Sequence, residues 1–152
     1  MSDSAQVPVI PPAVPLAFLA VGALVQMAIP LSIGPLAVVR PLGLVALATS
    51  TLLVAFAVHE LRRAKTAFDV RRPTTRLVTT GVYRLSRNPV YLSIILLCWA
   101  VGFLTNALFV LVAAIPAAST LCIVVIRREE RYLRKKFDAE FVEYCRRVRR
   151  WI

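Results

Sequence analysis

The sequence predicts an all-α, polytopic membrane protein with four transmembrane helices and a cytoplasmic, amphipathic C-terminal helix. Hydrophobic residues make up 59% of the 152 residues, and the mean hydropathy is +0.72. The apolar residues form runs that are too long for the core of a soluble domain. Basic residues gather between and after these runs. The length fits one domain, so we expect residues 1–152 to form a single membrane domain.

The membrane spans are predicted from the apolar runs and the residues that interrupt them. Pro30 and Pro35 limit the end of the first run, and a short turn around Gly34–Pro41 precedes the second. A later apolar stretch of 37 residues is too long for one span, and the polar pair Thr105–Asn106 lies near its middle. This stretch is therefore expected to form a helical hairpin. The four predicted spans cover residues 13–33, 42–61, 89–104 and 107–126.

The distribution of basic residues predicts the orientation of these spans. Lysines and arginines number none before the first span, one in the first turn, eight between the second and third spans, none in the third turn and ten after the fourth. The positive-inside rule then places both termini and the loop at 68–88 in the cytoplasm. The net charge of +11 is expected to face the anionic lipid of the bilayer rather than a nucleic acid.

The charged tail at 127–150 has helical periodicity. Its apolar residues recur at steps of three or four and form one stripe, while basic residues occupy the other face. We expect an amphipathic helix that lies against the membrane or against the loop. The stripe consists of Leu133, Phe137, Phe141, Tyr144 and Val148.

The composition gives no support for metal catalysis or for a disulfide framework. The three cysteines are scattered, the chain has one histidine, and no cluster has the spacing of metal ligands, so we predict no metal site. His59 and Glu60 end the second span. They are either a proton-handling pair or simply the end of a helix in the headgroup layer, and the sequence leaves both readings open.

The stretch from Thr74 to Tyr91 is the main polar interruption of the hydrophobic part of the chain. The residue before a proline is biased towards extended geometry, so Asn88 is not expected to be helical. Pro89 is suited to the first position of the following helix. A helix start offers backbone N–H groups and a partial positive charge, which favours an anionic ligand group.

The motif L-V-T-T-G-V-Y-x-x-S-R-N-P-V-Y in this stretch resembles the signature of a family of membrane methyltransferases. This family is related to isoprenylcysteine carboxyl methyltransferase and phospholipid N-methyltransferase. A second motif, R-R-E-E-R-Y-L-R-K-K-F-D-A-E-F-V-E-Y, follows about forty residues later and is similar to the second signature of the family. Together the two motifs cover roughly residues 68–150, while the first half of the chain carries no comparable signature.

The resemblance implies binding of S-adenosylmethionine, with S-adenosylhomocysteine as the product. It implies no catalytic or substrate-binding residue that we can name. The sequence has no G-x-G-x-x-G turn, so the cofactor would require a scaffold other than the Rossmann type. Without the resemblance, we would interpret Glu129 and Glu130 as part of a solvated face with salt bridges. Tyr83 would then be interpreted as part of an interfacial aromatic belt. The cofactor-binding residues carried over from the family are Leu77, Val78, Tyr83, Arg87, Asn88, Pro89, Glu129 and Glu130.

The sequence departs from well-known family members at three positions. Asn88 replaces the histidine of R-H-P and cannot act as a titrating base, although its amide still donates hydrogen bonds. Val125 stands where eukaryotic prenylcysteine enzymes have an arginine, which weakens the link to the processing of prenylated CaaX proteins. Asp138 replaces a glycine after Phe137, and we expect this change to matter little on an exposed turn.

We therefore expect an S-adenosylmethionine-dependent methyltransferase that acts on a lipophilic acceptor at the cytoplasmic membrane face. The reaction would be direct displacement of methyl from sulfur, with positioning and desolvation supplying the acceleration. The acceptor atom, oxygen, nitrogen or sulfur, stays open. One alternative is a non-catalytic four-span scaffold that retains the fold. Another is a transporter subunit, which would be expected to bury a charged residue inside the membrane; the predicted span interiors contain none.

Overall fold

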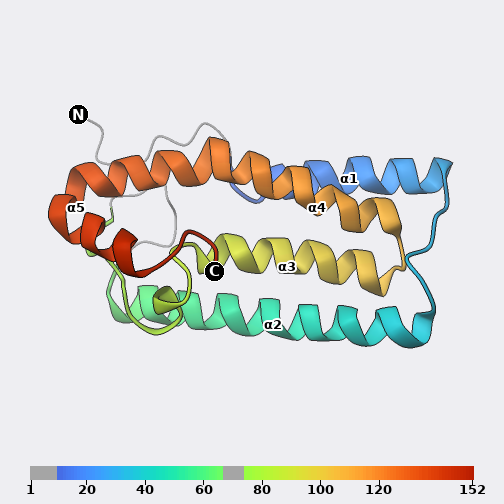
Figure 1. Ribbon diagram of the computed structural model, residues 1–152, viewed down its shortest axis with the longest axis horizontal. Coiled ribbons are helices and arrows are strands. Elements are labelled where there is room, and N and C mark those ends of the chain that lie inside the picture. The colour runs from blue at the N-terminus through green and yellow to red at the C-terminus, as the bar shows by residue number, and fades with distance from the viewer. Residues whose placement is uncertain (1–9, 67–73) are drawn as a thin grey trace. The chain divides into compact units, whose positions relative to one another are not determined.

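The computed structural model describes residues 10–66 and 74–152. Within these residues the protein is all-helical and has no strand (Figure 1). The order along the chain is α1, α2, a 3₁₀ turn (η1), α3, α4, a π-helical segment (η2) and α5. Their bounds are α1 Ala13–Ala28, α2 Leu36–Arg63, η1 Gly81–Arg84, α3 Pro89–Leu104, α4 Leu108–Thr120, η2 Leu121–Ile126 and α5 Arg127–Arg147.

The chain divides into two compact units. Of the described residues, one unit holds those within Leu53–Val90 and Cys122–Ile152. The other holds those within Val9–Leu52 and Tyr91–Leu121. We refer to them as the motif unit and the apolar unit, because the first contains both sequence motifs except for Tyr91.

In the apolar unit, α1 packs closely against α4. A Cβ added to Gly22 would lie 2.7 Å from the carbonyl oxygen of Phe109. Small residues of this kind allow helix backbones to approach each other inside a membrane. Between the α2 and α3 parts of this unit, the buried Ser50 hydroxyl donates a hydrogen bond of 2.7 Å to the carbonyl of Ser93. Much apolar surface stays exposed on α1, where Met27 is 80% exposed, as expected for a helix in lipid.

The turn between α3 and α4 breaks the long apolar stretch where the sequence predicted. Asn106 has a left-handed backbone (φ 52°), and the amides of Asn106 and Ala107 donate to the carbonyls of Phe103 and Gly102. These two bonds form a Schellman motif that ends α3. The Asn106 side chain then pairs with the backbone of the α1–α2 connection: its Oδ1 accepts from the amides of Ile33 (2.9 Å) and Gly34 (3.2 Å).

Three helix boundaries differ from the predicted spans. Helix α1 ends at Ala28 instead of residue 33, because Ile29 precedes Pro30 and takes a non-helical conformation (φ −131°, ψ 87°). Helix α2 covers 36–63 rather than 42–61 and includes Pro41, which was predicted to lie in a turn. The amides of Val38 and Val39 donate to the carbonyl of Pro35, so the helix already begins before Pro41.

The fourth predicted span, 107–126, does not end in a turn. Helix α4 passes through η2 into α5 and stays helical up to the kink at Asp138 (Figure 1). A π-helical segment widens the turn and is frequent at functional sites. Among the described residues, two helices are apolar and long enough to cross a membrane, Leu36–Arg63 and Leu108–Arg147, while α1 and α3 are apolar but shorter.

The C-terminal helix ends at Arg147, before the predicted residue 150, because Val148 is extended (φ −124°). The predicted apolar stripe is confirmed: Phe141, Tyr144 and Val148 are buried, and Leu77, Leu133 and Phe137 pack against them. The stripe therefore contacts the loop through Leu77. The expectation that Asp138 matters little is wrong, because Asp138 has φ 38° and ψ −112° and interrupts α5. Glycine adopts such a conformation far more easily than aspartate.

Candidate functional site

The described part of the loop is fastened to α2 through Glu60. The Thr80 hydroxyl donates a hydrogen bond to the Glu60 carboxylate. Gly81 has φ 57°, and a Cβ on Gly81 would lie 2.8 Å from the Glu60 carboxylate. The loop can approach Glu60 this closely only because residue 81 lacks a side chain. The His59–Glu60 pair of the sequence therefore contributes at least one residue that binds the loop.

Val78 and Tyr83 are both buried in one apolar cluster with Ala57 of α2. The Tyr83 backbone is held from α5, where the Tyr144 hydroxyl donates a hydrogen bond of 2.7 Å to the Tyr83 carbonyl. Leu77 packs instead into the cluster around Phe141 and Tyr144. The L-V segment thus connects two clusters, one with α2 and one with α5.

The phenol of Tyr83 lies in a negative environment. Burial raises its pKa well above the usual 10, and the charges of Glu129, Tyr144 and Glu60 raise it further, in that order. The phenol therefore stays protonated and can donate a hydrogen bond at neutral pH. A cation placed near Tyr83 would be stabilised by the carboxylates of Glu129 and Glu60.

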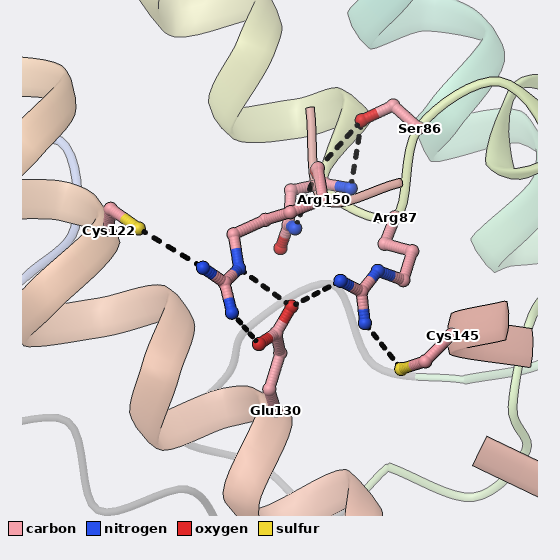
Figure 2. A network of polar contacts seen from close by, with 7 residues as sticks. Ser86, Arg87, Cys122, Glu130, Cys145 and Arg150 are labelled. Atoms are coloured by element: carbon pink, nitrogen blue, oxygen red, sulfur yellow. Dashed lines mark hydrogen bonds and ion pairs between the residues drawn. The ribbon is translucent and has the colours of Figure 1, made fainter. Parts of the chain in front are cut away.

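Glu130 lies in a different environment, between two arginines (Figure 2). Arg150 donates to both of its oxygens, from Nε to Oε1 (3.0 Å) and from Nη2 to Oε2 (2.6 Å). Nη2 of Arg87 lies 3.4 Å from Oε1. The Arg87 and Glu130 side chains are only 14% and 15% exposed. The two hydrogen bonds from Arg150, whose side chain is 34% exposed, fix the orientation of the Glu130 carboxylate, and Arg87 adds a single ion-pair contact.

The R-N-P motif itself is bound by the C-terminal segment. The amide of Arg87 donates to the carbonyl of Arg149 (3.1 Å), and Asn88 Nδ2 donates to the carbonyl of Arg150 (2.9 Å). The buried Ser86 hydroxyl donates to the same Arg150 carbonyl at 3.3 Å and accepts from the Asn88 amide. Asn88 is not helical and α3 begins at Pro89, as predicted.

All eight predicted cofactor-binding residues lie in the motif unit. Leu77, Val78 and Tyr83 belong to the loop clusters, and Arg87, Asn88 and Pro89 connect the loop to α3. Glu129 and Glu130 lie in the first turn of α5. Residues 68–73 of the predicted cofactor loop fall outside the described residues. The sequence analysis did not identify Glu60 as a contact of the loop, nor Ser86 and Arg150.

One polar atom in the described part of the motif unit suggests a missing partner. Nε of Arg87 is buried and makes no hydrogen bond, although Nη1 of the same group donates to Cys145 Sγ and Nη2 faces Glu130. A buried donor without a partner is costly and is commonly explained by a water or a ligand. The residues around the loop thus offer a cationic donor at Arg87 and a negative region at Tyr83, two features that an amino-acid-like ligand requires.

Comparison with known proteins identifies the family. A family model described as phospholipid methyltransferase matches residues 38–140, which is more than half of the chain. The chain belongs to this family. Its members are membrane methyltransferases, and they generally use S-adenosylmethionine. The matched range includes the loop, α3, α4 and the first part of α5, and therefore contains all eight predicted residues.

A curated relative gives a shorter match. The cobalt-zinc-cadmium resistance protein CzcN of Cupriavidus metallidurans is 38% identical over 77 residues, which is 51% of this chain and 35% of that protein. The chain thus spans about a third of the length of this relative. Among the residues that the structure describes, no group of three or more His, Cys, Asp or Glu side chains is placed to hold a metal ion. No solved structure matches the chain.

Proposed function

We propose that this protein is an integral membrane, S-adenosylmethionine-dependent methyltransferase that acts on a lipophilic acceptor at the cytoplasmic membrane face. The observation that carries the proposal is the pairing of two features on one loop of the family motif. These are the unpartnered Nε of Arg87 and the negative environment of Tyr83. The cofactor has matching groups, a carboxylate and two cationic centres.

The residues of this chain would bind the cofactor by charge and by shape. Arg87 Nε would donate to the carboxylate, which would remove an unpaired buried donor. Glu129, whose charge acts on Tyr83, would stabilise the positive end. Leu77 and Val78 would present apolar surface to the adenine. When bound, S-adenosylmethionine supplies a methyl group on a cationic sulfur, which a lone pair of the acceptor displaces.

Tyr83 would orient the ligand without taking a proton. Its raised pKa keeps the phenol neutral, so it would donate a hydrogen bond and leave the negative charge to Glu129. Its burial with Val78 and Ala57 would exclude water from one side of the reacting groups. In such a site, positioning and desolvation supply most of the acceleration.

A lipophilic acceptor is supported by the apolar character of the helices. We propose four spans formed by α1, α2, α3 and the α4–η2 segment, with the motif unit at the cytoplasmic face. Val125 is fully buried in the motif unit, so this position offers no charge to an acceptor carboxylate. This supports an acceptor other than the prenylcysteine carboxylate, and lipids with an amine or hydroxyl head are the first candidates to test.

The proposal is tested by methyl transfer. Detergent-purified protein is incubated with methyl-tritiated S-adenosylmethionine and vesicles made from a host lipid extract, and label in the organic phase is counted. We expect time-dependent label that a heat-denatured sample does not give. Binding of the cofactor without transfer to any lipid class would instead support the scaffold alternative. Absence of both binding and transfer in folded protein would contradict the proposal.

A further inference from the structure

The chain ends in a short extended segment that lies against the R-N-P motif. After Val148 leaves the helix, the carbonyls of Arg149 and Arg150 accept hydrogen bonds from the Arg87 amide, the Asn88 side chain and the Ser86 hydroxyl. These three contacts use only backbone atoms of the C-terminal segment. A change of the Arg150 side chain therefore leaves them available, and the segment is expected to stay attached.

The Arg150 side chain adds a second and separate contact. Its Nε and Nη2 form a two-pronged pair with the Glu130 carboxylate at 3.0 and 2.6 Å, and its Nη1 lies 3.8 Å from Cys122 Sγ (Figure 2). The hydrogen bonds to Glu130 raise the pKa of the Arg150 guanidinium, which therefore stays charged. Two parallel bonds between planar groups fix the orientation of the carboxylate as well as its position.

The orientation of the Glu130 carboxylate determines which nitrogen atoms of Arg87 are paired. The Oε1 atom that accepts from Arg150 Nε is the same atom that lies 3.4 Å from Arg87 Nη2. Cys145 binds Nη1 of Arg87 on the other side. With both terminal nitrogens engaged, Nε is the donor that stays unpaired. Without Arg150, Glu130 could rotate to pair with Arg87 by two bonds, through Nε and Nη2, and the unpaired donor would be lost.

We propose that Arg150 is a positioning residue of the cofactor site, which holds Glu130 so that Arg87 Nε stays available to an anionic group of the ligand. Arg150 itself touches no ligand in this account. The inference rests on the proposed function, since the anionic group is taken to be the carboxylate of S-adenosylmethionine. In this proposal Glu130 keeps Arg87 in the orientation that leaves Nε available, and Glu129 faces the positive end of the ligand.

The test is calorimetric titration of the full-length, detergent-purified protein with S-adenosylhomocysteine, which carries the same carboxylate. Arg150→Ala is expected to weaken binding by at least about tenfold. Arg150→Lys keeps the positive charge but cannot form two parallel hydrogen bonds with Glu130. Its affinity for S-adenosylhomocysteine is therefore expected to lie between those of Arg150→Ala and the wild type. The matched control is Arg146→Ala, because Arg146 lies in the last turn of α5, just before the C-terminal segment, and its side chain is 75% exposed and pairs with Glu143.

The outcomes separate this inference from the proposed function. If the wild type binds and Arg150→Ala binds equally well, the positioning role is wrong while the methyltransferase proposal stands. If the folded wild type does not bind, the proposed function fails and the positioning role fails with it. A loss of affinity in Arg150→Ala that Arg150→Lys partly restores, with both variants melting like the wild type, would support the inference. Should Arg150→Ala not fold, Arg150→Gln is used, since it keeps one hydrogen-bond donor towards Glu130.

Discussion

Tyr83 shows how a single residue of the motif acquires its properties from three elements. Tyr83 is buried in a cluster with Ala57 of α2, and its carbonyl accepts a hydrogen bond from the Tyr144 hydroxyl of α5. The charges of Glu129 and Glu60 help to raise the pKa of its phenol. The sequence predicted that Tyr83 is a cofactor-binding residue, but it could not predict that the Glu60 carboxylate acts on its phenol. Glu60 is 23 residues earlier in the chain, at the end of a helix whose face towards the loop is not visible in the hydropathy pattern.

The raised pKa of Tyr83 predicts a loss of stability at alkaline pH. Below pH 10 the phenol is protonated in both the folded and the unfolded protein, so its contribution is constant. Above pH 10 the unfolded chain releases this proton and the folded protein does not, so the free energy of unfolding falls as pH rises. Tyr83 alone lowers it by at most about 1.4 kcal/mol per pH unit. Thermal unfolding in detergent at pH 9, 10 and 11 measures this slope.

Tyr83→Phe is the matching variant, because it keeps the ring and the backbone carbonyl that accepts from Tyr144. We expect a shallower loss of stability above pH 10 than in the wild type. Tyr132→Phe serves as a control for the general effect of removing a tyrosine from this part of the chain. If the free energy of unfolding fell equally steeply with pH in Tyr83→Phe and in the wild type, the Tyr83 phenol would not be shielded from solvent.

The two adjacent glutamates could not be distinguished from the sequence. Both stand in the first turn of α5, and both resemble the family signature. Their difference arises from Arg150, which is 20 residues away and reaches Glu130 only because Val148 leaves the helix. The sequence predicted that the helix continues to residue 150. A helix of that length gives no reason to expect the contact between Arg150 and Glu130.

At the scale of elements, α5 is interrupted at Asp138, and the interruption has a measurable cost. An L-residue at φ 38° and ψ −112° is strained, by about 1–3 kcal/mol. Asp138→Gly is therefore expected to stabilise the protein by about 1 kcal/mol, which thermal unfolding in detergent would measure. The adjacent exposed, helical Ala139 provides the control: Ala139→Gly should destabilise by a similar amount. Stabilisation by both changes, or by neither, would contradict the observed backbone at residue 138.

The turn between α3 and α4 depends on the side chain of Asn106. Its amide pairs with the backbone of Ile33 and Gly34 through three hydrogen bonds. Asn106→Gly keeps the left-handed backbone but removes these bonds, so we expect a loss of about 1–3 kcal/mol of stability. Thr105→Ala is the control, because the Thr105 hydroxyl bonds only to carbonyls of its own helix, and its expected effect is below about 0.5 kcal/mol. Equal effects of the two substitutions would contradict the role assigned to Asn106.

At the scale of the whole molecule, the all-helical class, the hairpin break and the start of α3 at Pro89 were predicted because each depends on local signals. Proline, asparagine and apolar run length act within a few residues. The ends of α1, α2 and α5 were less accurate because helix ends depend on single backbone conformations, such as that of Ile29. The contacts of the motif unit were not predictable, since they join residues about 20 to 60 positions apart in sequence.

The proposed four-span arrangement would require short helices to cross the bilayer. Helices α1 and α3 have 16 residues each and would measure about 24 Å, less than the roughly 30 Å of hydrocarbon. The connection after α1 is itself apolar, and Asn106 and Gln26 pair with its backbone and with the start of α4. Backbone satisfied in this way tolerates an apolar environment, so this end of the apolar unit is suited to lie below the headgroups.

The positive-inside distribution predicts the orientation of the chain when it is produced in the inner membrane of a bacterial expression host. A green fluorescent protein fused after Ile152 should fluoresce, and alkaline phosphatase at the same position should be inactive. Alkaline phosphatase fused after Asn106 should be active, because this turn faces the other side in a four-span protein. The reverse pattern would contradict the orientation, and activity at both positions would contradict the number of spans.

The central claim is that the loop, Arg87 and Glu129 form a site for S-adenosylmethionine, and it is tested most directly by calorimetric titration with S-adenosylhomocysteine. We predict saturable binding by the folded wild type and a loss of at least about tenfold in affinity in Glu129→Gln. Glu140→Gln, an exposed glutamate of the same helix, should bind within about twofold of the wild type. Unchanged affinity in Glu129→Gln, or no binding by the folded wild type, would contradict the account.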